Sequence, residues 1–135
     1  MAVASIVSKL TPVLVVESIE PVVAFWNKLG VQASTEVPGE QGLVFAILSG
    51  EGVEVMYQTV ASVKEDLVAS ASAPDVFRSG PQQTTLYVQV QNLADVESRL
   101  EGERLIMPRR TTFYGAIEVA YTDPAGNIIV FAERH

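Results

Sequence analysis

Near the C-terminal end, two apolar runs flank a five-residue polar turn. The first run, Gly115 to Tyr121, carries apolar and β-branched residues on alternate positions with Glu118 among them, and the second, Asn127 to Ala132, is almost wholly apolar. The turn between them is Asp123-Pro124-Ala125-Gly126-Asn127, in which Asp can bond its own backbone, Pro presets φ, and Gly and Asn accept positive φ. The pattern predicts a β-hairpin whose second strand is buried on both faces or nearly so.

The rest of the chain shows one pattern twice. A strand that ends in a capping residue is followed by an amphipathic helix, with Ser18 as the first cap and Asn92 as the second, 74 positions later (92 − 18). Three strand patterns follow each helix, and Trp26 falls on the apolar face of the first helix. In the second half we expect a short strand from Glu103 to Met107 and a loop from Pro108 to Thr111.

This repetition predicts an α+β fold made of two βαβββ repeats in a single domain, 1–135. Repeat one spans about 6–58 and repeat two about 84–133. The linking segment, about 59–83, begins with a helix that Thr59 can cap and continues as a loop through Ser79.

Composition narrows the functional classes. The chain has no cysteine, so thiolate chemistry and sulfur-ligated metals are excluded, and its one histidine, His135, is the last residue. A formal net charge of −7 disfavours nucleic acid as a partner. The sequence has neither the features of a signal peptide nor an apolar run of roughly 20 residues, so we expect a cytoplasmic protein without a membrane partner.

Two motifs resemble those of the vicinal oxygen chelate superfamily, which includes glyoxalase I, extradiol dioxygenases and bleomycin-resistance proteins. One is Glu17 to Trp26 with Leu29-Gly30, and the other is the Asp123 to Asn127 turn. The resemblance covers nearly the whole chain. It implies that the curved mixed sheets of the two repeats pair around a cavity, and that the protein is a homodimer, in some members with repeats exchanged between chains.

In metal-using members of that superfamily, the resemblance places metal ligands on the first and last strands of each repeat. The corresponding positions here are Thr11, Glu54, Thr85 and Val130, of which only Glu54 is a residue that the superfamily uses. One carboxylate, two hydroxyls and an apolar side chain make a poor set for the common divalent ions. We therefore expect no metal and no cofactor.

Two carboxylates are candidate site residues. Glu54 and Glu118 each alternate with apolar neighbours in a predicted strand, so each could point into the cavity as a general base or as an anchor for a ligand. If they face one another, they could share a proton. The plainer alternatives are exposed strand positions for both, or an ion pair with an arginine for Glu54.

The other candidates would bind a ligand without reacting with it. An arginine fork from Arg109 or Arg110 could hold a carboxylate or a phosphate, although an exposed loop or an internal salt bridge is the commoner outcome. Aromatic rings that could stack on a ligand, with the core as the alternative, come from Tyr57, Tyr87, Phe113 and Tyr114.

The chain lacks nucleophile-elbow, phosphate-loop and dinucleotide-binding motifs. The hypothesis that best fits these observations is a metal-independent small-molecule binding protein of the sequestration or resistance type. Two alternatives stay open. One is a metal-dependent glyoxalase-like or dioxygenase-like enzyme, and the other is a metal-free enzyme that uses Glu54 or Glu118 as its base.

Overall fold

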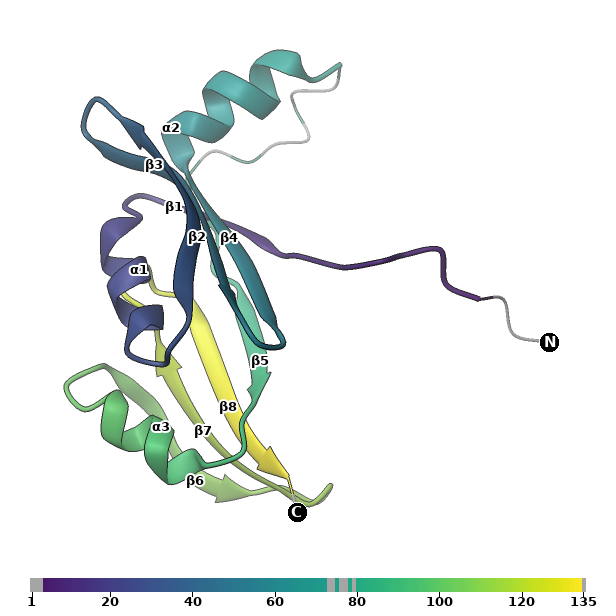
Figure 1. Ribbon diagram of the computed structural model, residues 1–135, viewed down its shortest axis with the longest axis vertical. Coiled ribbons are helices and arrows are strands. Elements are labelled where there is room, and N and C mark those ends of the chain that lie inside the picture. The colour runs from purple at the N-terminus through teal and green to yellow at the C-terminus, as the bar shows by residue number, and fades with distance from the viewer. Residues whose placement is uncertain (1–3, 73–74, 76–77, 79, 135) are drawn as a thin grey trace.

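The computed structural model describes residues 4–72, 75, 78 and 80–134, and it contains two similar units joined by a short helical segment (Figure 1). The first unit consists of β1 (Val13–Val16), α1 (Glu20–Asn27), β2 (Gln32–Gly39), β3 (Gly42–Gly50) and β4 (Val53–Thr59). The second consists of β5 (Thr85–Gln89), α3 (Leu93–Arg99), β6 (Leu105–Thr111), β7 (Ala116–Thr122) and β8 (Ile128–Arg134). This order confirms the predicted pair of βαβββ repeats.

Each unit forms one four-stranded mixed sheet, and the two sheets have the same topology. The strand orders are β1-β4-β3-β2 and β5-β8-β7-β6, and the first strand of each unit runs parallel to the last. Val13 pairs with Met56 in the first sheet, and Tyr87 pairs with Val130 in the second. The second pair lies 74 positions after the first in both of its residues (87 − 13 and 130 − 56). The two predicted caps, Ser18 and Asn92, have the same spacing.

Of the two predicted helix caps, Asn92 is confirmed and Ser18 is wrong. Asn92 caps α3, because its Oδ1 accepts the N–H of Asp95 at 3.2 Å. Ser18 does not cap α1, which begins one residue later than expected, with Ile19 at the cap position and no side-chain cap. The carbonyl of Ile19 instead accepts the N–H groups of the first turn, which include that of Val22.

The helix that begins the segment between the units is less regular than predicted. Thr59 caps it as expected, with Oγ1 accepting the N–H of Ser62 at 3.2 Å. The α-helix α2 (Val60–Val63) then widens into the π-helical η1 (Lys64–Val68). Parts of the predicted linker, Ser79 among them, and His135 lie outside the described residues. In the described part of the chain, no helix is long and apolar enough to cross a bilayer.

The helices α1 and α3 lie on the same side of the molecule (Figure 1), and each covers one face of its own sheet. We call this covered surface the helix face of each sheet and the opposite surface the open face. The helix faces supply one continuous apolar core, in which Trp26 is only 2% exposed, as the sequence predicts. Residues 4–10 extend away from the body as an arm on which Ile6 and Leu10 are almost fully exposed (Figure 1).

A buried chain of hydrogen bonds crosses from the first unit to the second. Trp26 Nε1 donates to Tyr57 Oη at 2.9 Å, and Tyr57 Oη donates to Asp123 Oδ2 at 3.3 Å. Asp123 Oδ1 accepts the N–H groups of Ala125 and Asn127, both at 2.9 Å, which closes the predicted turn. The β7–β8 turn is therefore attached to the core of the other repeat.

We expect Tyr57→Phe to lower the free energy of unfolding by about 1–3 kcal/mol, because it leaves the buried Trp26 N–H and Asp123 carboxylate without a shared partner. Equilibrium unfolding in denaturant measures this change. Tyr121→Phe removes a hydroxyl from the same core without breaking the link, so it is the matched control and should cost less. Equal losses for the two variants would show that the link contributes nothing specific.

Gly126 has a φ of +90°, a conformation that L-residues rarely adopt, while a Cβ at this position would meet no atom within 4 Å. Gly126→Val should therefore destabilise the fold by about 1–2 kcal/mol through the backbone alone. Asparagine tolerates positive φ better, so Gly126→Asn should cost less. Thermal unfolding of both variants checks the order, and a Val variant as stable as the Asn variant would contradict it.

Candidate functional site

The open face of the first sheet carries an apolar strip between polar ends. Cross-strand pairing puts Val13, Met56, Ile47 and Thr35 in one row across the four strands. Val13, on the edge strand β1, is 48% exposed and stands at one end of this row. A contiguous apolar patch on a sheet face is typical of a surface that contacts a ligand or another protein.

Glu54 lies one row further along, at the edge of the strip. Its Oε1 accepts the hydroxyl of Thr11 at 2.5 Å, and its Oε2 pairs with Lys9 Nζ at 2.7 Å. The bond from Lys9, followed by that from Thr11, lowers the pKa of the Glu54 carboxyl below its usual value. Glu54 thus points to the open face, and it also ties the base of the N-terminal arm to β4.

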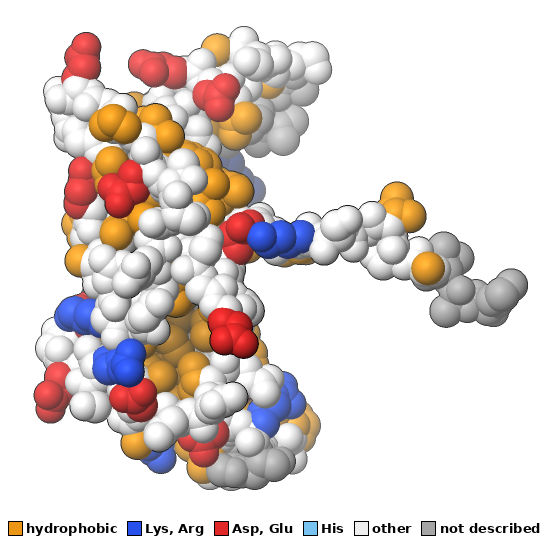
Figure 2. Space-filling model, in the orientation of Figure 1, with side chains coloured by type: hydrophobic (Ala, Val, Ile, Leu, Met, Phe, Trp, Pro, Cys, Tyr) orange, Lys and Arg blue, Asp and Glu red, His pale blue; other side chains and the backbone are white. Residues whose placement is uncertain are grey.

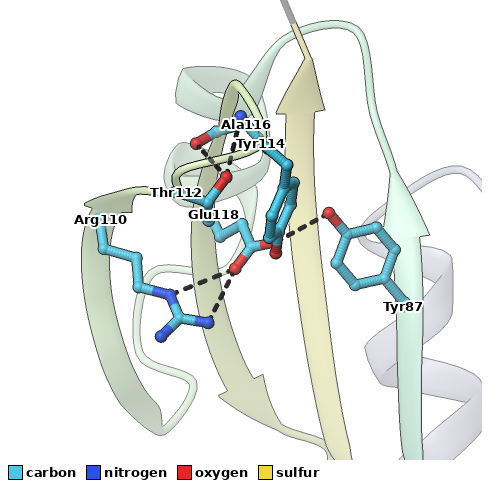
Figure 3. A network of polar contacts seen from close by, with 6 residues as sticks. All are labelled: Tyr87, Arg110, Thr112, Tyr114, Ala116 and Glu118. Atoms are coloured by element: carbon cyan, nitrogen blue, oxygen red, sulfur yellow. Dashed lines mark hydrogen bonds and ion pairs between the residues drawn. The ribbon is translucent and has the colours of Figure 1, made fainter.

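The open face of the second sheet is built around Glu118, which is 1% exposed (Figure 3). Tyr87 Oη donates to its Oε2 at 2.8 Å, and Tyr114 Oη donates to the same oxygen at 2.5 Å. Arg110 donates to Oε1 through Nε at 3.2 Å and through Nη2 at 3.0 Å. Four of the residues singled out in the sequence therefore come together in one cluster: Tyr87, Arg110, Tyr114 and Glu118.

This cluster fixes the charge state of its members. The hydrogen bond from Tyr114 is the largest influence on the pKa of the Glu118 carboxyl, which is lowered despite the opposing effect of burial. The pKa of Tyr87 is raised to about 12, chiefly because its hydroxyl donates to Glu118. Around neutral pH Glu118 is therefore a carboxylate and Tyr87 is a neutral phenol.

The two neighbouring arginines point to opposite sides of β6. Arg110 pairs across the strands with Glu118 on the open face, whereas Arg109 Nη2 contacts Oε1 of Glu97, on α3, at 2.6 Å. The sequence predicted a loop here, and that prediction is wrong, because β6 continues through Pro108 to Thr111. Proline is tolerated since β6 is an edge strand with an irregular register at this point.

Tyr57, another ligand-binding candidate, lies away from this cluster. It is fully buried on the helix face, where it carries the hydrogen bonds to Trp26 and Asp123. Burial raises the pKa of its hydroxyl well above the usual value, so it stays neutral. In the structure Tyr57 contributes to the core that joins the repeats.

Arg134 belongs to the cluster and was missed in the sequence. Its guanidinium carbon lies 5.7 Å from the centre of the Tyr114 ring. It ends β8 two residues after Ala132, which pairs with Glu118, and this period-two spacing was the available signal. Beside it, the Phe113 ring is 99% exposed and meets the Tyr114 ring edge-on at 5.1 Å.

Glu54 and Glu118 do not share a proton or a donor, because each carboxylate is bonded to donors from its own unit. The two open faces nevertheless meet at a groove of about 350 Å³ between β4 and β5, to which Glu54 and Tyr87 both contribute. A second groove, of about 440 Å³, lies between the repeats on the side of the helices. Figure 2 shows apolar side chains in this hollow, whose floor includes Trp26, Val53 and Phe131.

The positions that correspond to the superfamily's metal ligands do not offer a set of donors. Strand pairing makes Met56 the counterpart of Val130, which corrects the placement of this position on Glu54. The four positions are then Thr11, Met56, Thr85 and Val130, and hydroxyls, a thioether and an isopropyl group do not suit a divalent ion. Among the described residues, no group of three or more His, Cys, Asp or Glu side chains could hold a metal.

The sequence matches no protein-family profile and no curated protein. Solved structures do match, and one is TioX from Micromonospora sp. ML1, with a TM-score of 0.73, 15% identity, and coverage of 95% of this chain and 99% of that one. A glyoxalase/bleomycin resistance protein/dioxygenase from Nocardioides gives a TM-score of 0.68 and 20% identity, covering 98% of this chain and 87% of that one. Lactoylglutathione lyase from Agrobacterium tumefaciens gives a TM-score of 0.69 and 18% identity, covering 96% of each chain.

At these identities the likeness concerns the fold, and it extends over almost the full length of the chain. The paired four-stranded sheets, their shared topology and these structural relatives agree with the resemblance seen in the two sequence motifs. The chain therefore has the glyoxalase/bleomycin resistance protein/dioxygenase fold of the vicinal oxygen chelate superfamily.

Proposed function

We propose that this protein binds a small molecule on its open sheet faces, without a metal, and that it does so as a homodimer. The proposal rests on the contrast in chemistry between the open faces of the two sheets. The first sheet offers an apolar strip that includes Val13 and Met56, and the second offers a cluster of fixed polar groups around Glu118. Binding sites combine such an apolar lining with a few well-placed polar groups.

A second copy of the chain is part of the proposal, because an open sheet cannot enclose a ligand. Binding sites for drug-sized molecules bury roughly 70–90% of the ligand surface. A single chain leaves Val13 and Tyr87 almost half exposed on these faces, and it extends the arm with Ile6 into solvent. Two copies with facing sheets would cover these residues and form a closed cavity.

The two enzymatic alternatives have weaker support. The metal-dependent one needs ligands at positions that Thr11, Met56, Thr85 and Val130 occupy. The metal-free one needs a carboxylate with a free lone pair and a pKa that favours proton transfer. Glu118 accepts four described hydrogen bonds, which fill its roughly four lone-pair sites, and its pKa is lowered.

Ligand stabilisation in the absence of metal tests the proposed function. We expect some members of a chemically diverse compound set to raise the melting temperature in buffer with EDTA, because a ligand at 100 times its Kd adds about 2.7 kcal/mol. Adding divalent ions should not increase the shift. Stabilisation that requires a divalent ion would favour the metal-dependent enzyme instead.

A charge on the apolar strip should abolish the dimer. We expect the unmodified protein to elute with the mass of two chains in size-exclusion chromatography with light scattering, and Met56→Glu with the mass of one. The control is Leu105→Glu, which changes a 50% exposed apolar residue that lies outside the open faces. A single-chain mass for the unmodified protein, or the same loss in both variants, would contradict the dimer.

The fixed charge of Glu118 should appear in the pH dependence of stability. The pKa of Glu118 in the folded protein lies below its usual value of 4.5, so its stabilising effect is complete above pH 4.5 and is lost as the pH falls through the folded-state pKa. We expect the fall in unfolding free energy below pH 4.5 to be less steep in Glu118→Gln. Denaturant unfolding at several acidic pH values measures it, and identical slopes would contradict a charged, hydrogen-bonded Glu118.

A further inference from the structure

We infer that the cluster around Glu118 recognises an aromatic anion, with Arg110 and Arg134 holding its acidic group and the Tyr114 and Phe113 rings contacting its ring. This inference rests on the proposed function, since it assigns a ligand class to the open face of the second sheet. The inference rests on a comparison of the donors and acceptors in the cluster that already make described hydrogen bonds with those that do not.

Glu118 has no capacity left for a ligand. Its carboxylate is 1% exposed and accepts two bonds from Arg110 and one from each of Tyr87 and Tyr114. A cationic ligand would have to displace one of these donors and desolvate its own charge as well. Glu118 therefore holds the neighbouring side chains in place through its hydrogen bonds.

Arg110 has N–H donors that its described hydrogen bonds do not use. A guanidinium carries five N–H groups, and the two described bonds to Glu118 leave three (5 − 2). Its side chain is 57% exposed, although its anchor is buried. A guanidinium held in place by a buried carboxylate loses little freedom when it binds, and the planar array of its N–H groups fits a carboxylate or a phosphonate.

Arg134 adds the positive charge that makes an anion the favoured ligand. Glu118 and Arg110 neutralise each other, so the guanidinium of Arg134 above the Tyr114 ring gives the cluster a net charge of +1. The site thus attracts an anion locally, although the whole chain has a net charge of −7.

Aromatic surface lies next to these charges. The Phe113 ring is 99% exposed and stands edge-on to Tyr114, which is itself 44% exposed. Exposed rings beside two guanidinium groups suit a ligand whose own ring stacks while its acidic substituent meets the arginines. Small aliphatic anions would use only half of these groups.

Probes of matched shape and different charge test the inference on the full-length protein. Benzoate, phenylphosphonate, neutral benzamide and cationic benzylammonium are titrated separately, and binding is followed by two-dimensional NMR of the backbone amides and the arginine side chains. We expect saturable shifts with the two anions, centred on Arg110 and on the strand around Glu118. Benzamide and benzylammonium should bind at least tenfold more weakly.

The adjacent arginines provide a matched pair of variants. Arg110→Gln should weaken benzoate binding at least tenfold, whereas Arg109→Gln, which breaks the contact with Glu97 on the other side of β6, should change it less than twofold. If Arg110→Gln does not fold, Arg110→Lys keeps the charge without the planar fork and should weaken binding at least threefold.

The outcomes separate this inference from the proposed function. Benzamide or benzylammonium binding at the open faces as tightly as benzoate overturns the anion assignment and leaves a small-molecule site. Equal losses in the Arg109 and Arg110 variants, or benzoate shifts confined to other surfaces, also overturn it. If the compound set raises the melting temperature but none of the four probes binds, the anion assignment is overturned and the proposed function stands. If neither the compound set nor the probes give an effect, the inference and the proposed function are both overturned.

Discussion

The hydrogen bonds that converge on Asp123 join the two repeats into one structure. The carboxylate of Asp123 closes its own turn and accepts the Tyr57 hydroxyl, which in turn accepts the indole N–H of Trp26. Burial raises the pKa of this carboxyl, and the surrounding N–H and O–H donors counteract the shift. Because all these groups are buried, loss of one leaves the others without water as a substitute. The orientation of the two sheets, and with it the position of both open faces, depends on this connection.

The two open faces differ in their chemistry. The first sheet presents aliphatic side chains and the thioether of Met56, and its charged residue, Glu54, lies at the margin. The second has alanines at positions such as Ala120 and Ala132 and concentrates its charge in the Glu118 cluster. Similar backbones therefore carry different chemistry, since strand pairing fixes the positions of side chains and leaves their identity free.

The fold was predictable from the sequence because it depends on local signals, namely strand patterns, turn residues and helix caps. Alternating strands, an Asp-Pro-x-Gly-Asn turn and a repeated spacing of 74 residues are all visible in the sequence. The limits of elements were less predictable. Ser18 is a good capping residue that lies one position too early, and Pro108 suggested a loop although an edge strand accepts it.

The candidate site was predictable only in part, for a physical reason. Alternation placed Glu54 and Glu118 on strand faces, but it does not show which donors lie across the sheet. Tyr57 and Tyr87 look equivalent in the sequence, yet one is in the core and the other is on an open face. Arg134 joined the cluster through a contact with Tyr114, which is 20 positions away in the chain (134 − 114).

The irregular register of β6 makes this edge strand a point at which the proposed site can change while the fold is kept. Arg109 and Arg110 differ only in the side of the strand that they face, and the pairing is already irregular between Met107 and Arg110. Deletion of one residue just before Arg109 would turn Arg110 toward α3 and bring Thr111 to the position opposite Glu118, whereas an insertion would bring Arg109 there and keep a guanidinium. The strand has only one partner, so such a slip would leave the other strand pairs and the apolar core in place. Loss of a single codon in this stretch would thus remove the guanidinium from the proposed site and leave the rest of the fold in place.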